Sequence, residues 1–225
     1  MLRLCIALAC GLSTLSPVSA QTAPDATERT VIAAVEKLGG TAMIDAKLDE
    51  LARVATKFEK LDDAALIALG KLPNVGSIEV LDASRCTVKG VTGLKELPDL
   101  QTLVLGRSEL ADQSAAVIGS IRTLNVLYLG ESRITDVGAA SLAKLKNLRV
   151  LDVYDTKLTD RGIAHFAALA KLEDLNVSGT NITNVGLLQL KEMKTLKIVR
   201  AARTNVNRTG TDALEKEIPK LIVRF

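Results

Sequence analysis

The sequence predicts an α/β solenoid, a stack of similar units in which short parallel strands line a curved inner wall and helices form the outer wall. The first observation is a repeat: the pattern L-x-x-L-x-L-x-x-T-x-I-T-D-x-G-x-x-x-L-x-x-L starts at Leu124 and starts again 24 residues later, at Leu148. The second is a change of hydrophobic spacing inside each unit, from two residues to three. One such unit cannot cover its own apolar face, so several units must stack around a shared core.

The beginning of each unit predicts a strand and the end predicts a helix. In the unit that starts at Leu148, Leu151 and Val153 are two residues apart, as on a strand with one buried face. Phe166 and Leu169 are three residues apart, which is a helical spacing. Units in phase with this one give about seven repeats, which begin at Leu51, Val75, Leu100, Leu124, Leu148, Leu172 and Leu196.

Three columns of polar or small residues recur at the turns of the repeat. A hydroxyl that can bond nearby backbone groups follows each strand, at Ser108, Ser132, Thr156, Thr180 and Thr204. A short polar residue precedes each helix, where we expect it to cap free N–H groups, at Asp112, Asp136, Asp160 and Asn184. A glycine two residues later is expected to let neighbouring backbones approach closely, at Gly138, Gly162, Gly186 and Gly210.

The second unit departs from the pattern. Its segment 91–97 follows no T-D-x-G motif, so we expect an outer wall there with a shorter turn in place of a full helix. The unit also contains Cys86, which we interpret as a small buried residue. A reactive thiol would need a positively charged neighbourhood, and Arg85 alone is weak support for one.

The order of segments predicts one exported domain. Residues 1–20 have a single charge at Arg3, an apolar run and a small-residue end at Ala20, which is typical of a secretory signal peptide. Residues 21–27 form a polar linker, 28–50 an N-terminal helix and strand cap, 51–219 the repeats and 220–225 a C-terminal capping strand. We expect a periplasmic or extracellular protein. A lipid anchor at Cys10 is the alternative, although the residues before it make a poor lipobox.

Both caps have local signals. Asp25 or Thr27 can cap a helix over residues 28–38, and residues 41–44 then form a short strand. At the other end Pro219 interrupts the last unit, and the alternation of Leu221, Val223 and Phe225 predicts a final strand. Terminal units of this kind would cover the open ends of the stack.

Composition excludes several classes of partner. The formal net charge is +3, and removal of Arg3 with residues 1–20 lowers it to +2, which gives no electrostatic case for binding nucleic acid or a membrane surface. Aromatic residues make up 2 %, too few to suggest stacking on bases. After cleavage Cys86 is the one remaining cysteine, so the core must hold the fold without an intrachain disulfide, and no apolar segment would remain to insert into a membrane.

From Leu51 to Phe225 the motif resembles the leucine-rich repeat family. It is similar to the 24-residue T-D-x-G repeats of secreted bacterial leucine-rich proteins, and also to those of ribonuclease-inhibitor-like and F-box adaptor proteins. The last resemblance would imply a cytosolic, ubiquitin-ligase-type substrate adaptor. Against that implication, the repeats after Leu100 contain no cysteine, no F-box-like segment precedes them, and a signal peptide is present.

The residues between the core positions of the strands predict a binding surface on the concave wall. Neighbouring parallel strands lie about 4.8 Å apart, so Tyr128, Asp152, Asn176 and Arg200 should form one row. Tyrosine and arginine are common anchors at interfaces. We therefore expect a protein or peptide partner here; the candidate residues are Arg107, Tyr128, Glu131, Asp152, Tyr154, Asp155, Asp174, Asn176, Arg200 and Arg203. The competing interpretation is a solvated wall whose charges pair only with each other.

An enzyme is the rival class, although no catalytic or phosphate-binding motif is present. The single histidine, His165, falls on the predicted helix wall, away from any nucleophile. The pair Asp152 and Asp174 could perform acid and base chemistry in a hydrolase. A calcium ion held by these two residues and Asp155 is a weaker idea, because nothing resembles a calcium loop. The sequence therefore predicts a non-enzymatic binding scaffold without metal or cofactor.

Overall fold

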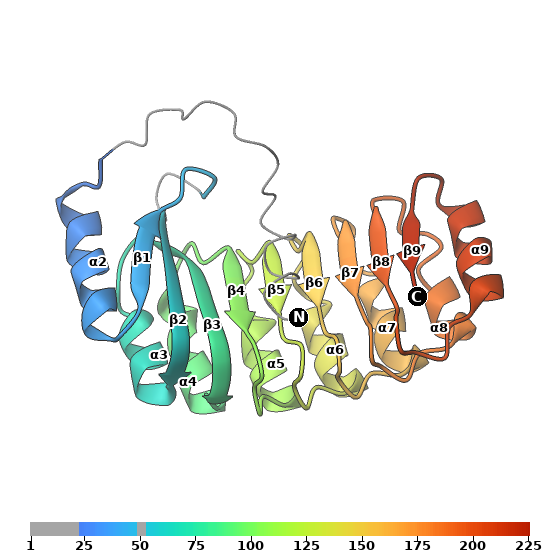
Figure 1. Ribbon diagram of the computed structural model, residues 1–225, viewed down its shortest axis with the longest axis horizontal. Helices are drawn as coiled ribbons and strands as arrows, with labels where there is room; N and C mark the ends of the chain where they lie inside the picture. The colour runs from blue at the N-terminus through green and yellow to red at the C-terminus, as the bar shows by residue number, and fades with distance from the viewer. Residues whose placement is uncertain (1–22, 49–52) are drawn as a thin grey trace.

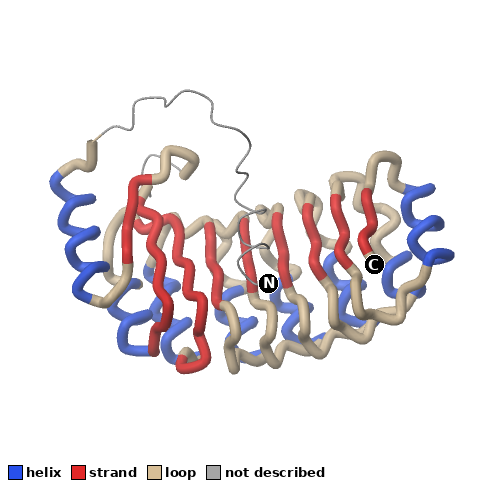
Figure 2. The backbone as a smooth tube through the Cα atoms, viewed as in Figure 1, coloured by secondary structure: helices blue, strands red, loops and turns tan. Residues whose placement is uncertain are grey.

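The structure, a computed structural model, describes residues 23–48 and 53–225, and it consists of a layer of strands and a layer of helices (Figure 1). Within the described residues the strands form one open sheet in chain order, β1 to β9. The stack bends so that the helices lie on its outer side (Figure 2). The predicted signal peptide, Cys10 and the start of the first repeat at Leu51 lie outside the described residues. This arrangement is the α/β solenoid that the repeat predicted.

The sheet runs through β1 (Thr41–Ile44), β2 (Val54–Asp62), β3 (Val75–Arg85), β4 (Thr102–Leu105), β5 (Val126–Tyr128), β6 (Val150–Asp152), β7 (Asp174–Asn176), β8 (Ile198–Arg200) and β9 (Ile222–Arg224). The helices are α2 (Ala26–Lys37), α3 (Asp63–Leu69), α4 (Val88–Gly93), the 3₁₀ turn η1 (Leu94–Glu96), α5 (Asp112–Ile118), α6 (Asp136–Leu142), α7 (Asp160–Phe166), α8 (Asn184–Leu188) and α9 (Arg208–Glu217). Each unit from β2 to β8 therefore contributes one strand and one helical segment, and β9 ends the sheet.

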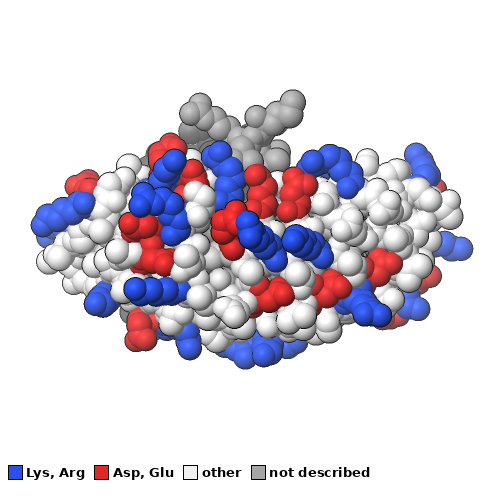
Figure 3. All heavy atoms as spheres, turned by 90° about the horizontal axis from the view of Figure 1, so that it is seen from below, with Lys and Arg blue, Asp and Glu red and all other residues white. Residues whose placement is uncertain are grey.

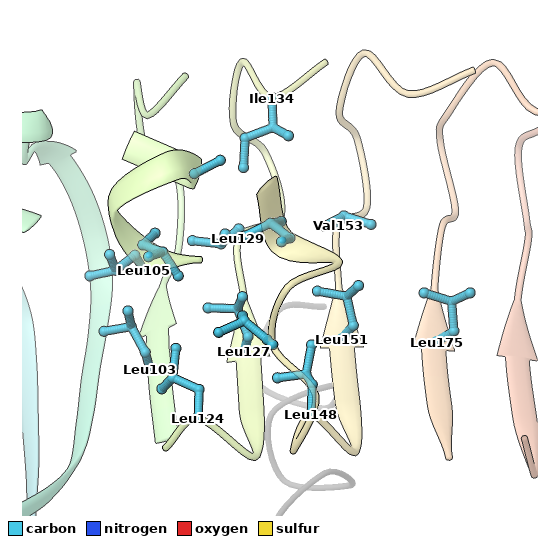
Figure 4. Close-up of a cluster of buried hydrophobic side chains, with 14 of the residues drawn as sticks. Leu103, Leu105, Leu124, Leu127, Leu129, Ile134, Leu148, Leu151, Val153 and Leu175 are labelled. Carbon is cyan, nitrogen blue, oxygen red and sulfur yellow. The ribbon is translucent and has the colours of Figure 1, made fainter. Parts of the chain in front are cut away.

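The core lies between the two layers and repeats with the period of the sequence. From β2 to β9 the strands are parallel, and the register aligns Leu103, Leu127, Leu151 and Leu175 on successive strands. Each of these four side chains is fully buried. Figure 4 shows them at matching positions along the stack. The alternation predicted from Leu151 and Val153 is confirmed, because every second strand residue enters this core.

The acid column joins neighbouring repeats, and the expectation that these acids cap their own helices is wrong. In α6, α7 and α8 the threonine before the acid or asparagine is the cap; in α6 the Thr135 hydroxyl accepts from the N–H of Val137. Asp136 is the first helical residue, and its carboxylate accepts from the N–H of Thr159 at 2.8 Å and from the Thr159 hydroxyl at 2.6 Å. Asp63, Asp112 and Asp160 bond the following repeat in the same way. As the first residue of its helix, each acid is placed to reach the turn of the next repeat.

The glycine column makes room for these carboxylates. A Cβ atom on Gly162 would lie 2.4 Å from Oδ1 of Asp136, and one on Gly186 would lie 2.2 Å from Oδ1 of Asp160. The nearest group is thus the acid of the preceding repeat, whereas the sequence suggested a neighbouring backbone. An added side chain at these glycines would displace the acid and break the bonds between repeats.

The hydroxyl column closes the turn after the strand, as expected, in the three repeats where it is threonine. The Thr156 hydroxyl donates to the carbonyl of Val153 at 2.7 Å, and Thr180 and Thr204 donate to the equivalent carbonyls. The Ser108 and Ser132 hydroxyls are buried, and neither has a hydrogen-bond partner within the described residues. The interpretation as a turn-stabilising column therefore holds for the threonines.

The first residues of the described chain cover the N-terminal end of the sheet. Helix α2 begins after Asp25, which accepts from the N–H of Glu28 in a capping box. The Glu28 side chain is 2 % exposed and pairs with Arg53 at 2.8 Å, so the charge that is removed from water has a partner at the start of the sheet. Strand β1 is antiparallel to β2 and ends the parallel ladder on that side.

Two expectations about irregular segments need correction. The outer wall of the second repeat is helical: α4, whose N-terminus is capped by Thr87, leads directly into η1. A short turn was expected there because the motif is T-V-K-G, but the threonine that caps the helix and Gly90 are both present. At the C-terminus Leu221 and Val223 are buried, whereas Phe225 is 53 % exposed, so the predicted alternation ends with β9.

Cys86 is a core residue. Its thiol is 1 % exposed and donates to the carbonyl of Leu61 at 3.4 Å. Burial raises the pKa of the thiol to about 12, and nearby carboxylates, with Asp63 first among them, act in the same direction. The interpretation of Cys86 as a small buried residue is confirmed.

Candidate functional site

The face of the sheet opposite the helices, here called the concave face, carries the predicted row. The strand register places Tyr128, Asp152, Asn176 and Arg200 side by side on β5, β6, β7 and β8. A second row, nearer the start of the strands, contains Val126, Val150, Asp174 and Ile198. Both rows are on this face because the row between them, Leu127, Leu151, Leu175 and Val199, enters the core, as the pleat of a strand requires.

A groove crosses the strands on the concave face. Its volume is about 340 Å³, and it extends from β3 to the turn after β8. The lining residues are Val80, Leu81, Val104, Gly106, Tyr128, Gly130, Asp152, Tyr154, Asn176, Ser178, Arg200, Ala202 and Arg203. Several of these have small or absent side chains immediately after their strands, which hollows the surface along that line.

Tyr154 lies across this line of small residues. A Cβ atom on Gly130 would lie 2.0 Å from the Tyr154 ring, so the ring covers the glycine of the preceding repeat. The Tyr154 hydroxyl donates to the carboxylate of Glu131. Burial and this acceptor raise the pKa of the tyrosine above its ordinary value. The two predicted residues Tyr154 and Glu131 thus form one unit above Gly130.

Gly179 permits an ion pair that spans two repeats. Asp155 pairs with Arg203 at 2.9 Å, although the two residues are 48 positions apart in sequence. A Cβ atom on Gly179, which lies between them, would be 1.8 Å from Oδ1 of Asp155. The sequence predicted both charged residues as site residues but gave no sign that they pair past an intervening repeat.

Four of the predicted residues occupy left-handed backbone positions. Arg107, Glu131, Asp155 and Arg203 have φ between 47° and 57°, and Gly179 holds the equivalent place with φ of 69°. This conformation costs roughly 1–2 kcal/mol for a residue that carries a Cβ atom. The repeat keeps charged side chains at the rim of the groove despite that cost, which is consistent with a role for them there.

Asp152 is the buried acid at the centre of the groove. Its side chain accepts from the backbone N–H of Tyr154 at 3.0 Å and from the amide of Asn176 at 2.8 Å, and the residue is 6 % exposed. Burial, which disfavours the charged form, raises the pKa of the carboxyl to about 6. The neighbouring Arg200 favours the charged form, but its guanidinium is bonded to Asp174.

The arrangement gives little support to catalysis or metal binding by the predicted acids. Asp174 is held by Arg200 and Asp155 by Arg203, so neither carboxylate is free beside Asp152. Across residues 23–48 and 53–225, no three His, Cys, Asp or Glu side chains converge where an ion could bind. His165 is exposed on α7, on the opposite side of the molecule from the groove.

The surface charges are mixed. Figure 3 shows basic and acidic side chains interspersed over the face that it presents, in keeping with the small net charge of +3. None of the helices in the described ranges is both long enough and apolar enough to cross a membrane.

Sequence reasoning missed the residues that shape the groove. Gly106, Gly130, Ser178 and Ala202 follow their strands at the same position of the repeat, and Tyr154 stands at that position in its own repeat. The signal was a column of small residues interrupted by one large aromatic residue. Of this column only Tyr154 was predicted as a site residue, because glycine, alanine and serine offer few groups that suggest binding.

The pKa of Asp152 predicts a specific pH dependence of stability. Because the folded pKa is raised from 3.8 to about 6, the native state binds more protons than the unfolded state between these values. Stability contributed by Asp152 therefore falls as pH rises from 4 to 6, by about 3 kcal/mol in total, and stays lower above pH 6.

The free energy of unfolding of the natural protein minus that of an Asp152→Asn variant should show this fall when it is measured by denaturant titration between pH 4 and 7. The subtraction cancels other carboxylates, such as Asp82 with its pKa of about 2. The altered bond to Asn176 in the variant shifts the difference by a constant. A difference that does not change with pH would contradict the raised pKa.

Comparison with known proteins agrees with this geometry. A model of the family described as leucine rich repeat matches residues 122–182. No curated protein matches the sequence. Among solved structures, the internalin InlF of Listeria monocytogenes is similar with a TM-score of 0.57 at 15 % identity, covering 71 % of this chain and 42 % of its own. Internalin C2 of the same organism has a TM-score of 0.47 at 23 % identity, with 60 % and 64 % covered.

This chain spans less than half the length of InlF, and at that identity the likeness concerns the fold alone. The family match covers two complete repeats and part of a third. The same strand, turn and helix recur from β2 through α9 in one parallel ladder. On the combined evidence of sequence motif, family match over residues 122–182 and stacked architecture, the chain has the fold of a leucine-rich repeat solenoid.

Proposed function

We propose that the protein is a non-enzymatic scaffold that binds a protein or peptide partner on its concave face. The observation that carries this proposal is the groove of about 340 Å³ that crosses the strands from β3 to β8. Solenoids present extended surfaces of this kind to partners, and concave, mostly apolar hollows with a few polar groups are typical binding sites.

The composition of the groove favours a macromolecular ligand. Tyr128 and Tyr154 are the two tyrosines of the chain, and both line it. Aromatic side chains bury a large area while retaining a polar end, which makes them frequent centres of interface energy. The mostly paired charges around them resemble the polar rim that surrounds such a centre.

The bonding of the two candidate acids, Asp152 and Asp174, favours a binding function over hydrolysis, the rival class. General acid and base catalysis by Asp152 and Asp174 needs both groups within reach of a substrate. Asp174 is engaged by Arg200, so its carboxylate is not available as the second group. The interspersed surface charges and the small net charge give no basis for nucleic acid as the partner.

We also infer that the protein is exported and that its partner lies in the periplasm or outside the cell. This inference rests on the signal-peptide pattern of residues 1–20. Mass spectrometry of the protein from its native host should find an N-terminus at Gln21. An acylated Cys10 would instead place the protein at a membrane surface, and retention of residues 1–20 would contradict export by this route.

Replacement of both tyrosines should abolish binding without unfolding the protein. We expect a Tyr128→Ala/Tyr154→Ala variant to recover its partner from the native secreted or envelope fraction at least about tenfold less well, since aromatic anchors carry most of the energy of such interfaces. Recovery is measured by quantitative pull-down, and thermal unfolding checks that the variant remains folded.

The matched control is Val137→Ala/Val185→Ala, which removes two apolar side chains that are 68 % and 64 % exposed on the helix side. This variant should recover the partner as well as the natural protein does. Loss of the partner in the control but not in the tyrosine variant would move the binding site to the helices. No specific partner with any of the three proteins would contradict the scaffold function.

A further inference from the structure

We infer that the groove binds an extended peptide segment with a lysine or arginine side chain directed at Asp152, between Tyr128 and Tyr154. This inference rests on the proposed function and adds to it the chemistry of the ligand. It depends on the shape of the groove, on which charged side chains are already paired and on the positions of the two tyrosines.

The groove has the direction and length of an extended chain. It crosses the strands from β3 to β8, which is five strand spacings. At about 4.8 Å per spacing this gives roughly 24 Å, the length of about seven extended residues. Gly106, Ser178 and Ala202 leave space for a backbone on either side of the Tyr154 ring, which itself covers Gly130.

Asp152, the acid that lines the groove, forms no ion pair within the described residues. Arg200 is bonded through both terminal nitrogens to Asp174, and Arg203 is paired with Asp155. Asp152 accepts from two neutral donors, the N–H of Tyr154 and the amide of Asn176. Among the described residues Arg200 favours the charged form of Asp152 from a distance, but its ion pair is with Asp174. The centre of the groove is therefore complementary to a positive charge.

A cationic ligand would stabilise the charged form of the buried Asp152 carboxylate. A buried carboxylate is costly unless it is paired, and the raised pKa of about 6 reflects that cost. Each carboxylate oxygen accepts one hydrogen bond from the protein and can accept another. An ammonium or guanidinium group from a ligand would supply both the missing donors and the missing charge.

The two tyrosines are placed to hold the side chain that carries the charge. Tyr128 is the register partner of Asp152 on the preceding strand, and Tyr154 follows Asp152 by two residues on the same face. The faces of tyrosine rings attract cations, and their carbon surfaces pack against the aliphatic part of lysine or arginine. An acidic ligand would instead have to break the ion pair of Arg200 or that of Arg203.

The test is a selection of random heptapeptides displayed on phage against the protein produced from the full-length sequence. We expect the selected peptides to share one lysine or arginine flanked by apolar residues. Substitution of that residue by norleucine, or of the protein by Asp152→Asn, should weaken binding about 10- to 100-fold, the range for a hydrogen bond to a charged group. The two changes made together should cost little more than either alone.

A charge-moving variant is the matched control for folding. In Asp152→Asn/Asn176→Asp the amide and the carboxylate exchange places, so the bonds to the N–H groups of Tyr154 and Ser178 remain and the bond between the two side chains is reversed. The charge moves by one strand, about 4.8 Å, away from Tyr128. This variant should melt like the natural protein and bind the selected peptides at least about tenfold less tightly.

The failures of the inference and of the proposed function are distinguishable. Peptides that need Tyr128 and Tyr154 but carry no basic residue, or that are indifferent to both changes at Asp152, would overturn the inference and leave the scaffold function standing. Acidic peptides that depend on Arg200 would do the same. If no selected peptide depends on the tyrosines, the inference falls, and the pull-down with the tyrosine variant decides whether the scaffold function falls with it.

Discussion

The contact between the acid that begins one helix and the threonine that caps the next is the interaction on which the regularity of the structure depends. Asp136 accepts two hydrogen bonds from Thr159, and Asp160 accepts two from Thr183. These bonds fix the spacing of helices whose strands are already aligned by the sheet. The apolar core supplies most of the stabilisation of such a stack. The hydrogen bonds from acid to threonine, here called the polar ladder, fix the orientation of one repeat relative to the next.

The dependence of regular stacking on these bonds is visible where the polar ladder is interrupted. In the second repeat Val88 stands where the others have the acid, and the next repeat has Ala111 in place of the capping threonine. The following glycine is also replaced, by the buried residue Ser114. All three positions change together because the threonine and the glycine serve the acid of the preceding repeat. At the C-terminal end Asn184 takes the acid's place and exchanges hydrogen bonds with Asn207.

Regular stacking in turn creates the groove. Because every repeat places the residue after its strand at the same height, one column of small residues hollows the surface across several strands, and the single large residue in that column, Tyr154, projects into the groove. The same regularity aligns Asp152 with Tyr128 and Asn176 on the neighbouring strands. A site of this kind belongs to no single repeat, so its properties depend on how neighbouring repeats differ in sequence.

Periodicity in the sequence was sufficient to predict the strands, the helices and the row from Tyr128 to Arg200, because each follows from the phase of the leucines. Contacts between repeats were harder to predict. The role of Asp136 was assigned to its own helix, since spacing within one repeat does not reveal which neighbour a side chain reaches. The pair of Asp155 and Arg203 was not foreseen, because it requires Gly179 to leave space in the repeat between them. The burial of Asp152 depends on side chains from three strands.

The most direct test of the central role of the ladder is the free energy of unfolding of Asp136→Ala and Asp136→Asn, measured by denaturant titration at pH 7. Alanine leaves the N–H and hydroxyl of Thr159 without their acceptor and should cost about 2–3 kcal/mol. Asparagine can accept from the same N–H, as Asn184 does from Asn207, and should cost less than about 1 kcal/mol. Equal effects of the two substitutions, or no effect of alanine, would contradict the account.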